Sequence, residues 1–504
     1  MLRKIRITLA AIFWVGITLL FLDFTGTAQT YLSWMAKLQF LPAVLALNVV
    51  VIVGLVVLTL LVGRIYCSVI CPLGVMQDII AWVSKRKLFR KNKKAKLANK
   101  YSYSPTKRVL RALVLLLFLI LMIAGLNSLA IFLAPYSAYG RIATNLMQPL
   151  YLWANNGLAA IAEHYDSYAF YSVDVWMRSG ISLAVAAGTL LIVGILAWRG
   201  GRTYCNTICP VGTVLGYVSH FSLFGPVFDE DKCNGCGLCA RNCKASCIDA
   251  KNHHVDMTRC VTCGDCMLAC SQHAVTFGNR LKASKKRLEP KEQKDLTDSD
   301  RRAFVKGLAL VGTAATIDAV AKTVDGGLAA IEDKVNPERK TPLTPPGSLS
   351  AQHFAQHCTA CQLCIAECPN QVLRPSDALE TFMQPTMQYD RGYCRPECTR
   401  CSQVCPAGAI KPITCEEKTA HQIGHAVWVK KNCVVLTDGV DCGNCARHCP
   451  TGAIEMVPLD DNDEIWVPAV NEEKCIGCGA CENLCPARPF SAIYVEGHET
   501  HREV

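Results

Sequence analysis

Thirty cysteines occur in this chain of 504 residues, and most of them recur at gaps of two or three residues. Gaps this short close into metal sites rather than disulfide loops. A C-x2-C-x2-C-x3-C run supplies three thiolates to one 4Fe–4S cluster from a tight loop, while its last thiolate serves a second cluster. Structural zinc instead uses separated pairs of cysteines. The runs therefore predict iron–sulfur clusters.

Two such runs stand in tandem between Phe228 and Arg280, which predicts a ferredoxin domain with two clusters. The proline that usually follows the fourth cysteine is replaced by Lys244 and Ser271, and Cys247 is a spare thiol that competes with Cys243. The spacing favours Cys243. Because the fourth cysteine of each run serves the other cluster, the expected ligand sets are Cys233, Cys236, Cys239 and Cys270, and Cys260, Cys263, Cys266 and Cys243.

Four further runs lie between Ser350 and Val504, and a proline follows the fourth cysteine of each. The long gap after Cys433 makes it the least certain ligand, and Cys415 is left over. Six runs of four predict six 4Fe–4S clusters, which use 6 × 4 = 24 of the 30 cysteines. The members of the last four runs are Cys358, Cys361, Cys364, Cys368; Cys394, Cys398, Cys401, Cys405; Cys433, Cys442, Cys445, Cys449; and Cys475, Cys478, Cys481, Cys485.

Four other cysteines form two C-x3-C-P pairs within an internal repeat: Cys67 and Cys71, and Cys205 and Cys209. Residues 63–74 read GRIYCSVICPLG and residues 201–212 read GRTYCNTICPVG, identical at eight of twelve positions. On a helix the i and i+4 thiols share one face, and the proline suits the first turn of a new helix. The pairs predict either helix breaks with buried thiols or a redox or metal site. A bound metal needs all four thiols, whereas two dithiol couples do not.

Long apolar runs must position these repeat motifs. They cover about Ile7–Leu22, Leu41–Val62, Val109–Leu133 and Gly180–Trp198, and each can cross a hydrocarbon core of about 30 Å. The motifs end the second and fourth runs, so the four predicted spans form two equivalent hairpins. Parallel repeats of this kind pack about an axis along the membrane normal. We therefore expect the four thiols at one depth, at the cytoplasmic rim.

One segment accounts for the net charge of +11, because Lys85–Arg111 contains twelve Lys or Arg residues and no acid. Beside transmembrane spans such a segment predicts orientation rather than nucleic-acid binding, since basic loops stay inside. The N-terminus and residues 228–281 are then expected on the cytoplasmic side.

A different signal lies between the two cysteine-rich regions. Arg301 and Arg302 precede Phe304 and Lys306, and a modest apolar segment follows. This pattern is that of a twin-arginine export signal; the alternative is an amphipathic linker helix with a chance Arg-Arg pair. The export interpretation predicts a fifth crossing over Ala303–Leu328, which would put the last four runs on the periplasmic side.

These features predict an α-helical membrane domain at residues 1–227 and α+β iron–sulfur domains of the bacterial ferredoxin type at 228–281 and 350–504. Residues 282–349 form a linker that contains the fifth crossing. No Cys-x-x-Cys-His sequence occurs, which excludes c-type haem. The four spans contain no histidine, which argues against a membrane haem with two histidine ligands.

The first 280 residues resemble the NapH family of membrane polyferredoxins, on the four spans, the two C-x3-C-P motifs and the tandem runs. Residues from about 300 onward resemble the NapG family of exported ferredoxins, on Arg301–Arg302 and the four runs. The resemblance implies a fusion in the bacterial inner membrane that takes electrons from menaquinol and the quinone pool. It would deliver them to a periplasmic reductase or electron carrier, notably a nitrate reductase, as an electron-transfer component rather than a complete enzyme.

A resemblance to four-cluster electron-transfer subunits implies that the first of the last four runs exchanges its fourth ligand with the fourth run, and the second with the third. The expected sets are then Cys358/Cys361/Cys364/Cys485, Cys475/Cys478/Cys481/Cys368, Cys394/Cys398/Cys401/Cys449 and Cys433/Cys442/Cys445/Cys405. Two other functions stay open: an accessory reductase for metal or cofactor maturation, and a polyferredoxin that lies wholly in the cytoplasm and feeds a soluble enzyme.

Overall fold

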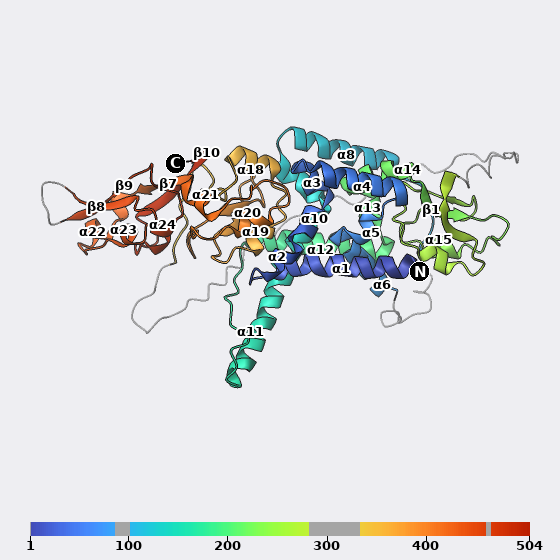
Figure 1. Ribbon diagram of the computed structural model, residues 1–504, viewed down its shortest axis with the longest axis horizontal. Helices are drawn as coiled ribbons and strands as arrows, with labels where there is room; N and C mark the ends of the chain where they lie inside the picture. Colours follow the sequence, from blue (N-terminus) through green and yellow to red (C-terminus); the bar gives the residue numbers. More distant parts are fainter. Residues whose placement is uncertain (1, 86–100, 282–332, 460–464, 504) are drawn as a thin grey trace, which may run out of the picture.

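The computed structural model describes residues 2–85, 101–281, 333–459 and 465–503. This described part is elongated, with a helical domain in the middle and a cysteine-rich block at either end (Figure 1). We call residues 224–281 the inner block and residues 333–503 the outer block. The predicted fifth crossing, Ala303–Leu328, and the Arg301–Arg302 pair lie outside the described residues.

The helical domain contains the internal repeat as two equivalent pairs of short helices. As predicted, Pro72 and Pro210 each begin the second helix of a pair, directly after a cysteine. The helices are α1 (Leu2–Leu22), α2 (Thr27–Lys37), α3 (Phe40–Leu45), α4 (Val49–Val62), α5 (Tyr66–Val69), α6 (Pro72–Val83), α8 (Arg108–Ile123), α9 (Asn127–Ala130), η2 (Ile131–Leu133), α10 (Pro135–Ile142), the π-helical turn η3 (Ala143–Met147), α11 (Gln148–His164), α12 (Gly180–Gly200), α13 (Thr203–Thr207) and α14 (Pro210–His220).

Within the described residues, two helices, α1 and α12, are long and apolar enough to cross a membrane. The expected span Leu41–Val62 is interrupted at Asn48, whose side chain accepts a hydrogen bond from the Val51 amide (3.2 Å) and caps α4. In the expected span Val109–Leu133, α8 ends early and Gly125 follows with a φ of 75°. The four uninterrupted spans are therefore not confirmed. Apolar composition alone does not reveal a cap or a left-handed glycine inside a run.

Large apolar side chains stay exposed on α4, α8 and α12. Val50 is 81% exposed and Ile123 is 86% exposed, and Leu116 and Leu191 are each more than half exposed. An extended apolar surface of this kind marks contact with a membrane or with another protein. Together with the length of α1 and α12, it indicates that the helical domain associates with a membrane.

The inner block is built from two antiparallel strand pairs and two short helices. β1 (Phe224–Phe228) pairs with β4 (Val275–Asn279), and β2 (Ile248–Asp249) pairs with β3 (His254–Val255). The helices α15 (Leu238–Asn242) and α16 (Asp265–Ala269) begin inside the two cysteine runs. Each follows a glycine in the left-handed region, Gly237 or Gly264, which lets the cysteine loop turn directly into a helix.

The outer block contains three antiparallel strand pairs, β5–β6, β7–β10 and β8–β9, among short helices. The longest pair, β7–β10, runs from Trp428 opposite Ile493 to His421 opposite Glu503. The elements are α18 (Ala351–His357), α19 (Leu363–Ala366), β5 (Leu373–Pro375), β6 (Pro385–Met387), α20 (Arg400–Val404), α21 (Cys415–Ala420), β7 (His421–Trp428), η4 (Lys430–Asn432), α22 (Val434–Thr437), α23 (Asn444–Arg447), β8 (Ile454–Pro458), β9 (Trp466–Val470), α24 (Ala480–Leu484) and β10 (Ile493–Glu503).

A buried histidine on β10 should make the outer block less stable in mild acid. Burial, together with the neighbouring His421 and His498, lowers the pKa of His501 to about 3. The folded imidazole therefore stays neutral where the unfolded chain binds a proton, below its usual pKa of about 6.5. Stability is full above that value and falls by about 1.4 kcal/mol per pH unit between about 6.5 and 3. We expect His501→Phe to flatten the pH dependence of the thermal unfolding midpoint between pH 7.5 and 5.5; an unchanged slope would contradict this assignment.

Candidate iron–sulfur sites

The two runs of the inner block lie next to each other. Cys266 lies within electrostatic range of Cys260, Cys263 and Cys243, and Cys239 lies within range of Cys233 and Cys270. The fourth cysteine of each run therefore lies beside the other run. The spare thiol also belongs here, because the Cys247 sulfur is 3.5 Å from that of Cys243 and also contacts Cys260. Both Cys243 and Cys247 remain candidates for the fourth position.

The outer block pairs its runs differently from the exchange implied by resemblance. One cavity is lined by Cys358, Cys361, Cys364 and Cys405. A second cavity is lined by Cys368, Cys394, Cys398 and Cys401. The first run thus exchanges its fourth cysteine with the second run, and neither Cys485 nor Cys449 reaches these cavities. Runs adjacent in sequence close a shorter loop than runs at opposite ends of the block, and the entropy lost on closure is smaller.

The third and fourth runs form the other pair. Cys481 lies within electrostatic range of Cys475, Cys478 and Cys445, and both Cys475 and Cys478 lie within range of Cys449. Cys445 in turn lies within range of Cys442 and Cys485.

Two cysteines of the outer block were hard to place from spacing alone. Cys433 packs in the same buried group as Cys442, Cys445 and Cys485, so it stays a candidate ligand despite its long gap. Cys415 does not line either of the two cavities; its side chain is exposed, and its thiol donates to the carbonyl oxygen of Glu397 (3.2 Å), the residue before Cys398.

The four outer sites follow one another away from the helical domain. The first run, with α19, lies beside the helical domain, α24 lies farther out, and α22 and α23 lie at the far end (Figure 1). The Cys394 amide donates to the Cys478 carbonyl oxygen (2.9 Å), which joins the two pairs of runs. Such a row can pass electrons stepwise from the helical domain to the distal end of the block.

The helical domain contacts the first run of the outer block through hydrogen bonds and close packing. Asn145 of η3 donates to the Gln362 side chain (2.7 Å), which donates to the Ser182 hydroxyl (3.2 Å). Gly140 packs against the carbonyl of Cys361 so closely that a β-carbon there would clash with its oxygen. The π-helical turn η3 lies at this contact, and such turns are frequent at functional sites.

Arg141 is an unusual neighbour of the same run. Its side chain is fully buried, and within the described residues its three guanidinium nitrogens have no hydrogen-bond partner. It lies over the Phe132 ring, 5.0 Å from the centroid, and within electrostatic range of Cys361. A buried cation without a partner is costly, so the position calls for a negatively charged group beside it.

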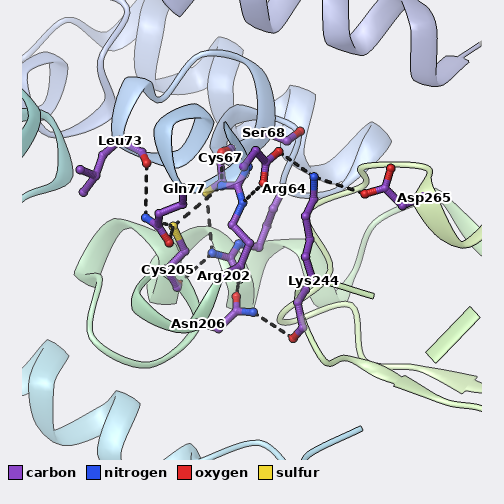
Figure 2. A network of polar contacts seen from close by, with 12 residues as sticks. Arg64, Cys67, Ser68, Leu73, Gln77, Arg202, Cys205, Asn206, Lys244 and Asp265 are labelled. Carbon is purple, nitrogen blue, oxygen red and sulfur yellow. Dashed lines mark hydrogen bonds and ion pairs between the residues drawn. The ribbon is translucent and has the colours of Figure 1, made fainter. Parts of the chain in front are cut away.

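The two C-x3-C-P pairs lie side by side, with all four thiols buried and within electrostatic range of one another. Two buried arginines cross between the repeat copies (Figure 2). Arg64 donates to the Cys205 carbonyl oxygen (3.2 Å) and contacts its own copy's Cys67 sulfur (3.7 Å). Arg202 donates to the Cys67 carbonyl oxygen (2.6 Å) and contacts the Cys205 sulfur (3.9 Å). The contacts are equivalent, so the repeats are related by a local twofold axis.

The glycine that ends each motif makes room for the opposite arginine. A β-carbon at Gly74 would lie 2.7 Å from Arg202 Nη1, and one at Gly212 would lie 2.8 Å from Arg64 Nη2. The result is a buried group of four thiols and two cations. Within the described residues, no group of three or more His, Cys, Asp or Glu side chains has the arrangement to hold a single metal ion.

Buried tyrosines connect the four-thiol site with the first outer site. Tyr66 lies within electrostatic range of Cys67 and Cys71. Tyr136 of α10 lies within range of Tyr66 on one side and of Cys361 on the other. Both rings are almost fully buried. The interior between the two candidate redox sites is therefore filled by aromatic side chains rather than by aliphatic ones alone.

Spacing rules for metal ligands did not single out Arg64, Arg202 or Arg141. The signal for the first two was present in the repeat, since both copies begin with Gly-Arg. No local pattern marks Arg141, because Cys361, the cysteine within its electrostatic range, is 220 positions away in the sequence.

Comparisons with known families agree with this division of the chain. A 4Fe–4S binding domain model matches residues 44–92 and 180–225, which contain the two repeat copies. A second 4Fe–4S binding domain model matches residues 226–249. A 4Fe–4S dicluster domain model matches residues 357–409 and 440–488. The first match contains the first two runs of the outer block, and the second contains the fourth run with the last three cysteines of the third, without Cys433.

Several curated relatives are similar over part of the chain. NapF of Escherichia coli K12, a ferredoxin-type protein, is 31% identical over 159 residues, covering 31% of this chain and 87% of NapF. MauM of Methylophilus methylotrophus, a methylamine utilization ferredoxin-type protein, is 30% identical over 197 residues, covering 37% of this chain and 81% of MauM. NapH of E. coli K12, also a ferredoxin-type protein, is 27% identical over 251 residues, covering 48% of this chain and 70% of NapH.

For other relatives the coverage is smaller. The chain spans 42% of an uncharacterized protein of Methanocaldococcus jannaschii and 60% of the E. coli protein YccM. No solved structure matches the chain. This chain nevertheless covers most of the length of NapF and of MauM, and iron–sulfur domain models match both of its blocks. These matches identify the family. The chain belongs to the ferredoxin-type 4Fe–4S electron-transport proteins, the family of NapF, NapH and MauM.

Proposed function

We propose that this protein carries electrons from menaquinol to a periplasmic terminal reductase through six 4Fe–4S clusters, as a multi-pass protein of the bacterial inner membrane. One observation carries the proposal: the two cysteine-rich blocks cap opposite ends of an apolar helical domain (Figure 1). Proteins that serve only one compartment do not need redox sites at both ends of a membrane-associated domain.

The residues fit the clusters that the proposal requires. Two cavities of the outer block are each lined by four cysteines from two runs. Arg141, buried beside Cys361 without a hydrogen-bond partner among the described residues, suits a cluster held by four thiolates, whose net charge is negative. When bound, each cluster would supply a one-electron carrier. The protein's part is to hold the sites in a row and to set their electrostatic surroundings.

The orientation follows from charge and from the export signal. The basic segment Lys85–Arg111 favours a cytoplasmic position for that side of the helical domain, where the inner block also lies. Arg301 and Arg302 precede the outer block and are the pattern of a twin-arginine signal. Export by that route would deliver the outer block folded, after its clusters are built in the cytoplasm. The resemblance to the NapH and NapG families implies a nitrate reductase-like system as the acceptor.

Epitope tags in intact spheroplasts test this topology. A tag after Val504 should bind antibody without permeabilisation, because the outer block is expected outside. A matched tag in the exposed turn between Asp249 and His254 should bind antibody only after permeabilisation. Changing Arg301 and Arg302 to lysine should make the Val504 tag inaccessible as well. If the Val504 tag of the unmodified protein is already inaccessible in intact spheroplasts, the protein is a polyferredoxin that lies wholly in the cytoplasm.

A further inference from the structure

A large cavity lies where the helical domain meets the outer block. Its volume is about 830 Å³, within the usual range for small-molecule sites. The start of α11, the middle of α12 and the loop at residues 171–179 form its walls, and residues 366–371 form its floor. Most of the wall is apolar, with Leu152, Trp153, Leu183, Leu190 and Trp176 among the lining side chains.

A few polar atoms in the cavity lack partners. Thr144, Gln148 and Glu367 all line it, and all three side chains are almost fully buried. Among the described residues, the Thr144 hydroxyl, the Gln148 carbonyl oxygen and both Glu367 carboxyl oxygens have no hydrogen-bond partner. Unpaired buried polar groups cost about 1–3 kcal/mol each. Their convergence on one apolar cavity indicates a ligand that is mainly apolar and has a few hydrogen-bonding groups.

The cavity borders a candidate redox site. Cys368, which lies with Cys394, Cys398 and Cys401, also lines the cavity floor. A ligand here would therefore touch the loop that holds a cluster. Among the lining residues, all of which the structure describes, Arg178 is the one base. That composition suits an uncharged redox compound better than a nucleotide cofactor, whose phosphates need several cations or backbone donors.

The cavity also lies beside a surface suited to a membrane interface. Helix α11 projects sideways from the long axis of the molecule at the junction of the helical domain and the outer block (Figure 1). Around it, Tyr151, Trp153, Tyr165, Tyr168 and Tyr171 are all exposed. Exposed Tyr and Trp side chains gather at the membrane–water interface. A lipid-soluble ligand at that depth could reach the cavity without crossing the aqueous phase.

We propose that this outer cavity binds the headgroup of a membrane hydroquinone, with Thr144, Gln148 and Glu367 positioned to hydrogen-bond its oxygens. The inference rests on the proposed function and adds the place where the electron donor binds. On becoming a quinone, a hydroquinone loses two electrons and two protons. The neighbouring clusters, when bound, supply two one-electron acceptors, and the protons pass to the solvent at the outer end.

The competing position is a second cavity of about 830 Å³ at the inner end of α1. Its charged groups pair with one another: Asp78 pairs with Arg6 (3.1 Å) and Lys244 (2.7 Å), and Asp265 pairs with Arg3 (2.8 Å). Among the described residues, the unpaired buried side-chain atoms of its lining are two donors, Arg6 Nε and Trp14 Nε1. The outer cavity instead has unpaired acceptors, which the two hydroxyl groups of a hydroquinone need.

Photolabelling can locate the ligand directly. The purified full chain with its clusters would be placed in lipid nanodiscs, incubated with an azido-naphthoquinone and irradiated, and the labelled peptides mapped. We expect label within residues 144–153 or 171–179, and competition by excess menadione. Label confined to α1 around Trp14 would place the ligand in the inner cavity and overturn the inference, as would label that excess menadione does not compete.

Binding to variants provides the second readout. Gln148→Leu and Thr144→Val should each weaken menadione binding, followed by tryptophan quenching, by about tenfold, the cost of about one hydrogen bond to a buried group. Gln148 also donates to the Ala366 carbonyl oxygen across the interface (3.2 Å). Gln29→Leu is the matched control, because it removes another hydrogen bond across the same interface, to Gln403 (2.7 Å), outside the cavity. If the cavity variants and the control bind menadione with equal affinity, the proposed site is wrong.

The proposed function is judged separately from the site. If menadiol does not reduce the clusters of the unmodified protein although the label maps to the outer cavity, the cavity binds quinone and the electron donor is a different compound. If menadiol reduces the clusters, but the label lies outside the cavity peptides and the cavity variants bind menadione as tightly as the unmodified protein, the proposed function stands and this site is wrong.

Discussion

Replacing Cys361 and Cys405 together with alanine should remove one 4Fe–4S cluster, whereas replacing Cys361 and Cys485 together should remove two. In the structure Cys361 and Cys405 line one cavity, so the second substitution damages a site that is already lost. Cys485 belongs with Cys442 and Cys445, so its loss damages a different site. With about four iron atoms per cluster, the unmodified protein should contain about 24 iron atoms, the first variant about 20 and the second about 16.

Iron and acid-labile sulfide, measured anaerobically on purified protein, distinguish the two exchange patterns. Cys415→Ala is the control and should retain the full content, because this exposed thiol does not line the two cysteine-lined cavities. The opposite result, with the larger loss in the Cys361/Cys405 variant, would restore the exchange between the first and fourth runs. If the unmodified protein contains only about eight iron atoms per chain, the outer block does not carry clusters and cannot be an electron carrier.

Local spacing predicts what a short segment does by itself. Three cysteines in a tight loop and a fourth from the neighbouring run are properties of the chain over about 40 residues, as in the inner block. The proline after Cys71 and Cys209 begins a helix for the same local reason. The repeat further indicates that its two copies have equivalent positions, and in the structure they face each other across a local twofold axis.

Features that depend on distant partners were not predictable in the same way. The exchange in the outer block depends on which of four similar loops pack together, and every run ends in the same Cys-Pro pair. Gln362 forms hydrogen bonds with Asn145 and Ser182, each of which lies more than 150 positions before it in the sequence. Neither Asn145 nor Ser182 therefore stands out in the sequence. The breaks at Asn48 and Gly125 interrupt runs whose composition is that of a membrane span.

The charged network around Asp78 predicts the largest loss of stability from a single substitution. Asp78 of α6 accepts hydrogen bonds from Arg202 (2.7 Å), Lys244 (2.7 Å) and Arg6 (3.1 Å). These cations come from the second repeat copy, the inner block and α1, and Arg202 is fully buried. One carboxylate therefore neutralises three basic groups and ties three parts of the molecule together (Figure 2 shows Arg202 and Lys244).

Asp78→Asn should keep the shape of this side chain and remove its charge. Arg202 and Arg6 then lose their carboxylate partner, and Lys244 keeps only Asp265 (3.4 Å). Removing one partner of a buried ion pair costs about 3–5 kcal/mol. Asp174→Asn is the matched control, because Asp174 pairs with Arg391 (3.0 Å) on an exposed surface, where an ion pair contributes about 1 kcal/mol or less.

Denaturant unfolding in detergent, followed by protease sensitivity of the inner and outer blocks separately, measures the difference. We expect the Asp78 variant to expose the inner block at much lower denaturant than the Asp174 variant, and to lose the contact of Lys244 with α6 first. The outer block does not touch Asp78, so its unfolding midpoint should change little. Equal midpoints for the two variants would mean that the three cations find other partners, and that the docking of the inner block does not depend on this carboxylate.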